Sequence, residues 1–426
     1  MADQVVVARV LLWGRQVGAV AEDTRGEVVF EYDPAFARGG LEISPRHLPL
    51  AHRGPITFPT LRRLDAFQGL PGVLADALPD RFGNAVIAAY FARQGRPADA
   101  LSPLQRLLYV GHRAMGALEF EPALDLGPLP AAEEALEVAR LVEEARRVIE
   151  GDARVAIPEI MQIGASAGGA RAKAVILWNR KTNRVRSGFA RPEAGDEPWI
   201  IKFDGVGEAG QPDPSPRPYN RIEYAYVHMA RAAGLDTGDV ALLKERRLTH
   251  FLTRRFDRDG PRRLHLHSLG GLDHADFNAP GGYSYEQYLR VCLELGLPPA
   301  AIDEAFRRTV FNLAAVNQDD HVKNFAFLMD QAGAWRLSPA YDLTFARGQG
   351  FTRTHQLTLG GKVDDFTRGN LLALGARLGL RQDGGSIIDR VLDAVGDWPR
   401  FARSARVPKE RTVAIGALHS RRVLKT

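Results

Sequence analysis

Residues 317–325 read NQDDHVKNF, and the first five of them are polar. They follow the strongly apolar segment FNLAAV at residues 311–316, which we expect to end a buried helix. A buried helix that opens into successive polar residues and then a strand is a poor packing design. It is a good way to hold reactive side chains on a rigid base. The stretch therefore predicts a catalytic loop.

A second acidic position follows in the segment LSPAYDL at residues 337–343, where Asp342 comes after a predicted strand. Asp319, Asn324 and Asp342 together offer two carboxylates and an amide oxygen, and Mg²⁺ prefers such ligands beside phosphate oxygens and water. This spacing suits a phosphotransferase. Asp319 would accept the proton of the incoming hydroxyl, and Asn324 and Asp342 would hold the metal on the nucleotide phosphates. Lys323 would neutralise charge on the transferred group. The alternative is a helix cap with surface charges.

Two upstream features fit the same chemistry. Residues 164–172 read GASAGGARA, and such small residues let backbone N–H groups approach phosphate oxygens. The segment lacks the Walker and protein-kinase glycine spacings, so a simple turn would also explain it. Lys202 ends an apolar strand, from which it could contact nucleotide phosphates, with Glu223 on the next helix orienting it by an ion pair. The alternative is an edge-strand lysine.

Composition sets the broad class. The chain has 426 residues, 45% of them apolar and 25% charged, as in a soluble protein of two or three packed units. One cysteine, Cys292, excludes an intramolecular disulfide and zinc sites built on cysteine pairs. No apolar run approaches the ~20 residues that span a bilayer, and the N-terminus reads as a strand without a basic leader. We therefore predict a cytoplasmic protein without a membrane partner.

The net charge of +5 rests on an excess of basic residues in residues 157–426. This excess favours anionic ligands such as nucleotides, although an arginine-rich solvated surface would look the same. Three histidines, His265, His267 and His274, also lie within ten residues. They raise the alternative of a metal site, but their spacing matches no metal-binding motif.

The order of elements predicts four segments. Residues 1–121 form a small α+β unit, residues 122–156 a linker and helix, residues 157–256 a strand-rich part and residues 257–426 a helix-rich part. Within the first unit, residues 75–93 look helical, with a break at Gly83-Asn84. A strand-rich part before a helix-rich part describes a two-lobed enzyme with a cleft between the lobes.

These motifs resemble the HipA-like serine/threonine kinases, the toxins of HipBA-type toxin–antitoxin modules, over most of the chain. The segments that carry the resemblance are LPDRFG at 78–83, VG at 110–111, MGAL at 115–118, SAGGARAK at 166–173, IIK at 200–202, RFDR at 255–258, DDHVKNF at 319–325 and AYDL at 340–343. The resemblance implies an α+β, two-lobed protein-kinase-like fold with a small N-terminal α+β subdomain and a helical C-terminal lobe.

The resemblance also implies a site for ATP and Mg²⁺. Asp319 would be the catalytic base, Asn324 and Asp342 the Mg²⁺ ligands, and Lys202 a contact of the ATP phosphates. The remaining ATP contacts would come from the phosphate-binding loop and from an interlobe hinge at the adenine: Ala167, Gly168, Gly169, Ala170, Arg171, Lys173, Arg254 and Phe256.

Regulation and partners follow from the resemblance in the same way. Ser166 falls where family members autophosphorylate, which expels the loop because a phosphoserine dianion cannot share a site with ATP phosphates. The partner would be a HipB-like helix-turn-helix antitoxin, through which the protein reaches DNA indirectly. The protein substrate would belong to translation, such as an aminoacyl-tRNA synthetase. The alternatives are a non-catalytic corepressor that binds the antitoxin, and a small-molecule kinase.

The sequence departs from the family pattern at two places. Asp320 stands where the best-known form has glycine, so either Asp319 or Asp320 could be the base, and the distance to Asn324 favours Asp319. Residues 179–198 form a longer connection than we expect between the phosphate loop and Lys202.

Overall fold

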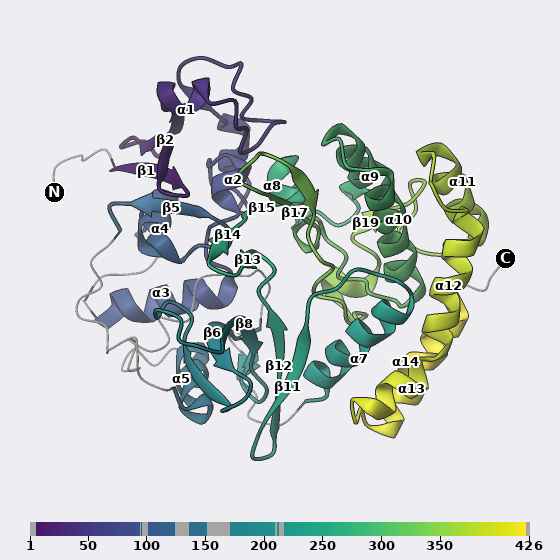
Figure 1. Cartoon of the computed structure of the whole chain (residues 1–426). Helices are drawn as coiled ribbons and strands as arrows, with labels where there is room; N and C mark the ends of the chain where they lie inside the picture. Colours follow the sequence, from purple (N-terminus) through teal and green to yellow (C-terminus); the bar gives the residue numbers. More distant parts are fainter. Residues whose placement is uncertain are drawn as a thin grey trace.

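The computed structural model describes residues 6–93, 95, 101–123, 136–150, 171–208, 211–212 and 217–422. Figure 1 shows an N-terminal sheet, a second sheet formed by the middle of the chain, and a layer of helices that ends with the C-terminal residues. Helices and strands are both abundant, which confirms the predicted α+β class. None of the described helices is long and apolar enough to cross a membrane.

The N-terminal sheet has the strand order β4-β3-β2-β1-β5, and every pair is antiparallel. Its strands are β1 (Val6–Leu12), β2 (Arg15–Glu22), β3 (Val28–Tyr32), β4 (Ile56–Thr57) and β5 (Leu118–Glu121). Alternate residues of β1 are fully buried, as expected for a sheet with one covered face. Helix α4 (Pro103–Val110) contacts β1, and a Ser102 capping box begins this helix.

The helix expected over residues 75–93 is broken, but not at Gly83-Asn84. The structure has α2 (Gly72–Ala75), a connection, and then α3 (Arg81–Arg93), which runs through both residues. Pro79 disfavours helical backbone in the residue before it. Asp80 accepts a 2.7 Å hydrogen bond from the Gly83 backbone N–H, so it begins the new helix as a cap.

The central sheet has the order β11-β12-β8-β6-β7. Its strands are β6 (Lys173–Asn179), β7 (Arg184–Ser187), β8 (Asp196–Lys202), β11 (Val240–Glu245) and β12 (Leu248–Arg254). Helix α3 packs against α5 (Val138–Glu150), and apolar residues of both helices share one core with the sheet, including Val86, Val142, Ile176 and Trp199. The core of this lobe is therefore built from three separate stretches of chain.

The helical part surrounds α10 (Pro299–Ala314), which is buried along most of its length. Around it lie α7 (Tyr219–Ala232), α9 (Tyr285–Glu294), α11 (Arg368–Leu378), α12 (Gly384–Gly396), α13 (Trp398–Ser404) and α14 (Lys409–Arg422). A three-stranded sheet, β15 (His265–Ser268), β17 (Ala326–Met329) and β18 (Trp335–Leu337), lies beside the short helix α8 (Leu269–Leu272). The two strands expected from the sequence, one after the catalytic loop and one before Asp342, are thus present as β17 and β18, and β15 pairs with β17.

A seam of histidines joins the N-terminal unit to the helical part. His265 Nε2 donates to the Ile43 carbonyl at 2.8 Å, and His267 Nε2 lies 3.0 Å from Ser44 Oγ. The backbone N–H of Gly72 donates to His274 Nε2 at 3.0 Å. These contacts give the three histidines structural roles, so the sequence cluster that raised the metal alternative is an interface.

Candidate active site

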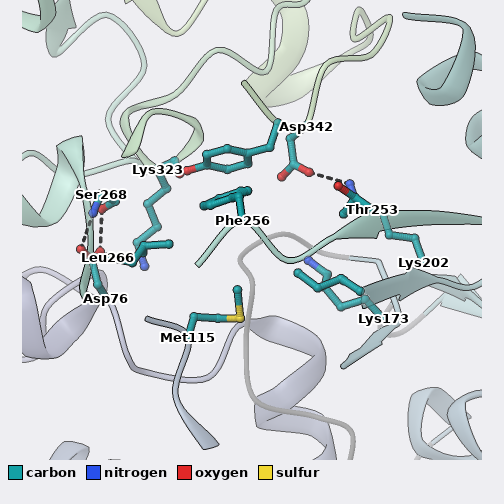
Figure 2. Close-up of a pocket in the computed structure, with 12 residues that line it drawn as sticks. Asp76, Met115, Lys173, Lys202, Thr253, Phe256, Leu266, Ser268, Lys323 and Asp342 are labelled. Carbon is teal, nitrogen blue, oxygen red and sulfur yellow. Dashed lines mark hydrogen bonds and ion pairs between the residues drawn. The ribbon is translucent and has the colours of Figure 1, made fainter. Parts of the chain in front are cut away.

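A pocket, partly open to solvent, lies where the three parts of the molecule meet (Figure 2). Its lining residues are Asp76, Met115, Lys173, Ile200, Lys202, Thr253, Phe256, Leu266, Ser268, Lys323, Tyr341 and Asp342. The pocket brings together four of the residues that the sequence predicted for nucleotide binding and catalysis and one predicted metal ligand.

Lys202 lies at the end of β8 between two carboxylates. Its Nζ is 2.5 Å from Glu223 Oε1 on α7. The same atom is 2.6 Å from Asp342 Oδ1, as Figure 2 shows. Burial alone would lower the pKa of Lys202, but the two carboxylates outweigh it and raise the pKa, so the ammonium is firmly charged. The predicted pair of Lys202 with Glu223 is confirmed. A fixed cation at the end of a strand is suited to phosphate oxygens.

Asp342 has an unusual backbone conformation for its residue type. Its φ is 52°, in the left-handed region that L-residues rarely adopt. Burial would raise the pKa of its carboxyl, but the ammonium groups of Lys202 and Lys173 outweigh burial and lower it. The preceding Tyr341 donates from its hydroxyl to the Lys323 carbonyl at 2.5 Å. This bond fixes the Asp342 segment to the predicted catalytic loop.

The catalytic loop leaves α10 through a second left-handed residue, Val316, with a φ of 55°. Such a value is rare for a β-branched side chain, and strain of this kind concentrates at functional sites. Further on, Asn324 donates from Nδ2 to the Asp319 carbonyl at 2.7 Å. This bond uses the NH₂ group of Asn324 and not its Oδ1, which is the atom that a metal ion would need.

Asp319 and Asp320 lie in different surroundings. The Asp319 side chain is 46% exposed, and His321 Nε2 is 3.8 Å from its carboxylate. Partial burial raises the pKa of Asp319, and the charges of Asp342 and Asp320 act in the same direction. Asp320 is fully buried, with both carboxylate oxygens hydrogen-bonded. Of the two carboxylates, only that of Asp319 is exposed to an incoming hydroxyl.

The residues expected to hold phosphate are described in part. Ser166, Ala167, Gly168, Gly169 and Ala170 lie outside the described residues.

The two charged residues that follow are described. Lys173 lines the pocket, and its Nζ is 3.2 Å from Asp80 Oδ2, with both side chains buried. Arg171 places its guanidinium over the Tyr219 ring, 4.5 Å from the ring centre, and does not line the pocket.

The predicted hinge places one of its two side chains in the pocket. The Phe256 ring lines the pocket and lies 5.4 Å from the Tyr341 ring. The Arg254 side chain is 46% exposed, 3.6 Å from Asp239, and lies outside the lining. Thr253, one residue earlier on β12, lines the pocket instead, because alternate strand residues face opposite sides.

Sequence reasoning missed the wall that the N-terminal unit contributes. Figure 2 shows Asp76 and Ser268 at one end of the pocket, Met115 along one side, and Lys202 with Asp342 at the other end. Asp76 accepts hydrogen bonds from the Ser268 N–H at 2.7 Å and hydroxyl at 2.6 Å. Nothing in the sequence pairs these residues, because tertiary packing alone brings them together.

Two models of protein domains match the chain. Residues 165–398 match the HipA-like C-terminal domain, and residues 8–121 match the HipA N-terminal domain. The chain belongs to the HipA family. Its fold is similar to that of a chain in the solved complex of HipA, HipB and operator DNA from the Shewanella oneidensis MR-1 toxin–antitoxin system. That likeness has a TM-score of 0.66 at 18% identity and covers 97% of this chain and 94% of the other.

Two relatives from Sinorhizobium fredii carry kinase names. The one named "Putative kinase Y4mE" is 25% identical over 352 residues, which cover 78% of this chain and 75% of the relative. The one named "Putative kinase Y4dM" is 25% identical over 180 residues, which cover 38% of this chain and 41% of the relative. Both relatives are thus named as putative kinases, and the HipA domain matches place the chain in the HipA family.

Proposed function

We propose that this HipA-family protein is an ATP- and Mg²⁺-dependent protein serine/threonine kinase. The observation that carries the proposal is the position of Lys202, held between Glu223 and Asp342 in the pocket. A lysine fixed by a helix carboxylate, beside an aspartate and next to a polar loop, is the arrangement that phosphoryl transfer requires.

Each residue would have a distinct role in the transfer. Lys202 would bind and orient the nucleotide phosphates, with Lys173 adding positive charge to the same end of the pocket. The exposed carboxylate of Asp319 would accept the proton of the acceptor hydroxyl. Lys323, which lines the pocket, would neutralise charge on the phosphoryl group. Catalysis would thus consist of positioning and electrostatic stabilisation.

The proposed metal site rests on its donor set. Asp342 offers a carboxylate and Asn324 an amide oxygen, and this pair suits Mg²⁺ when phosphate oxygens and water complete the shell. Bound Mg²⁺ would neutralise charge on the ATP phosphates. In the structure Asp342 Oδ1 contacts Lys202 Nζ. The proposed metal ligand and the proposed phosphate-binding lysine therefore lie side by side.

The partners follow from the family. We propose a HipB-like antitoxin, which would bring the protein to operator DNA, because the similar HipA chain was solved with HipB and its operator. The protein would act as the toxin of such a module in the cytoplasm. Its target would be a protein of translation, such as an aminoacyl-tRNA synthetase, and it would switch itself off by phosphorylation of Ser166.

The test separates ATP binding from transfer. Purified protein is titrated with MgATP by calorimetry and then incubated with γ-labelled ATP and an extract of its host. Asp319→Ala should keep the MgATP affinity and lose labelled phosphate transfer, whereas Lys202→Ala should lose affinity. Transfer that persists in Asp319→Ala would overturn the assignment of the base. An absence of MgATP binding in the wild type would overturn the proposed function.

A further inference from the structure

The chain returns to the catalytic loop after Asp342. The Gln318 backbone N–H donates to the Ala346 carbonyl at 2.9 Å, and the Ala346 N–H donates to the Val316 carbonyl at 3.2 Å. Ten residues later, the Gln356 backbone N–H donates to Asp320 Oδ1 at 2.7 Å. Both ends of residues 346–356 are therefore fixed to residues that flank Asp319.

The middle of this segment projects from the surface. We call residues 347–353 the acceptor loop. Phe351 is 59% exposed, although large apolar side chains are usually covered, and Arg347 and Arg353 beside it are exposed too. The loop holds its shape through a 3.1 Å bond from the Gly348 N–H to the Thr352 carbonyl. Within the part of the chain that the structure describes, neither arginine forms an ion pair.

The buried carboxylate of Asp320 holds the C-terminal end of the acceptor loop in place. Its Oδ2 accepts hydrogen bonds from the Tyr285 hydroxyl at 2.5 Å and from His355 Nδ1 at 2.7 Å, while Oδ1 accepts from Gln356. A buried carboxylate is costly unless donors surround it, and these three donors come from α9 and from the end of the returning segment. The carboxylate thus ties the catalytic loop to the acceptor loop.

We propose that the acceptor loop docks the polypeptide that receives the phosphoryl group, and that it fits an acidic segment with an apolar side chain. In this proposal Asp320 is a positioning residue that holds the docking surface beside Asp319. The proposal rests on the proposed function and names its substrate class. Two unpaired guanidinium groups select carboxylates, and an exposed aromatic ring between them offers an apolar anchor.

Binding of unreactive peptides tests the proposal without any transfer. The probes are two fluorescent peptides with alanine at the acceptor position, one flanked by glutamate and leucine and the other by lysine and leucine. We expect the full-length protein to bind the acidic peptide about tenfold more tightly in an anisotropy titration at low salt. Equal affinities would overturn the proposal. They would not affect the proposed kinase activity, which the ATP-binding and transfer assays test separately.

Charge reversal locates the surface. The double variant Arg347→Glu and Arg353→Glu should abolish the preference for the acidic peptide. The matched control, Arg403→Glu with Arg411→Glu, makes the same change of net charge on exposed arginines of α13 and α14 and should keep the preference. If the control loses as much affinity as the loop variant, general electrostatic attraction explains the binding and the docking surface is wrong.

The role of Asp320 needs a readout beyond folding. In Asp320→Ala, hydrogen exchange of the Gln356 amide should rise and the acidic-peptide affinity should fall about tenfold, with the MgATP affinity unchanged. Asp320→Asn keeps an oxygen for the Gln356 N–H and should restore most of the affinity. His355→Ala removes the hydrogen bond from His355 Nδ1 to the Asp320 carboxylate. This variant takes the place of Asp320→Ala if Asp320→Ala does not fold. Unchanged peptide affinity in a folded anchor variant would overturn the positioning role.

Discussion

Asp76 and Asp342 are carboxylates at opposite ends of one pocket, and their surroundings differ. Asp76 accepts hydrogen bonds from His267 and from both the N–H and hydroxyl of Ser268. Asp342 has a left-handed backbone, and its carboxylate accepts a hydrogen bond from the ammonium of Lys202. The first carboxylate is satisfied by several hydrogen-bond donors and holds two parts of the molecule together. The second is held in strain beside a cation, as expected of a group kept for a ligand.

The largest expected effect is on the rate of phosphoryl transfer, and it follows substitution of Asp342. Asp342→Asn should lower the rate of phosphoryl transfer by about 10³-fold or more, because the site loses a charge that the proposed metal ion requires. Lys202 keeps Glu223 as its partner, so the free energy of unfolding should fall by no more than about 3 kcal/mol, the contribution of one hydrogen bond between charged groups. Transfer rates and urea unfolding of the same preparation measure both quantities. A rate close to wild type would remove Asp342 from the site.

Breaking the satisfied end should instead cost stability. Asp76→Ala leaves His267 and the Ser268 N–H without their acceptor in a buried place, so we expect a loss of about 3–5 kcal/mol in urea unfolding. Asp76→Asn keeps one acceptor oxygen and should lose less. If Asp76→Ala unfolds at the same urea concentration as the wild type, the seam does not depend on this carboxylate.

The seam also depends on a close approach of two backbones. A Cβ atom placed on Gly72 of α2 would lie 1.9 Å from the Gly271 carbonyl oxygen of α8. Gly72→Ala should therefore push α2 from α8 and destabilise the protein by about 1–3 kcal/mol. At Gly396 in α12 a Cβ atom meets nothing within 4 Å, so Gly396→Ala is the matched control and should lose no stability. Equal melting temperatures for the two variants would contradict the close packing.

A further effect should appear as a pH dependence of stability. Burial lowers the pKa of His265 to about 4, with the neighbouring His267 acting in the same direction and the bond to Ile43 and the Asp76 charge opposing it. Its Nδ1 is buried without a hydrogen-bond partner, so a proton there would be poorly accommodated.

Since the unfolded chain binds this proton near pH 6.5, stability should fall as pH drops from about 6.5 to 4. The slope is about 1.4 kcal/mol per pH unit for this one group. His265→Gln removes the titrating group. Its free energy of unfolding should therefore change with pH by about 1.4 kcal/mol per pH unit less than that of the wild type in this range. An identical slope in the variant would show that other groups carry the acid sensitivity.

The sequence predicted the parts of the site whose signals are local. The catalytic loop, the strand pair after it and the Lys202–Glu223 pair each follow from residue types within or beside one element. The wall formed by Asp76 and Met115 could not be predicted, because only the packing of the N-terminal unit onto β15 and α8 brings them to the pocket. The role of Asp320 was hidden for the same reason, since its donors Tyr285, His355 and Gln356 are distant in sequence.

Mass spectrometry of the protein itself tests whether Asp319 is the base of a phosphoryl transfer. The wild type and Asp319→Ala are both purified in unphosphorylated form and incubated with MgATP. The intact mass of each protein and the masses of its peptides are then compared. We expect the wild type to gain one phosphoryl group, at Ser166, and Asp319→Ala to gain none. An equal gain in both proteins, or no gain in the wild type, would contradict the claim that Asp319 is the base of a phosphoryl transfer.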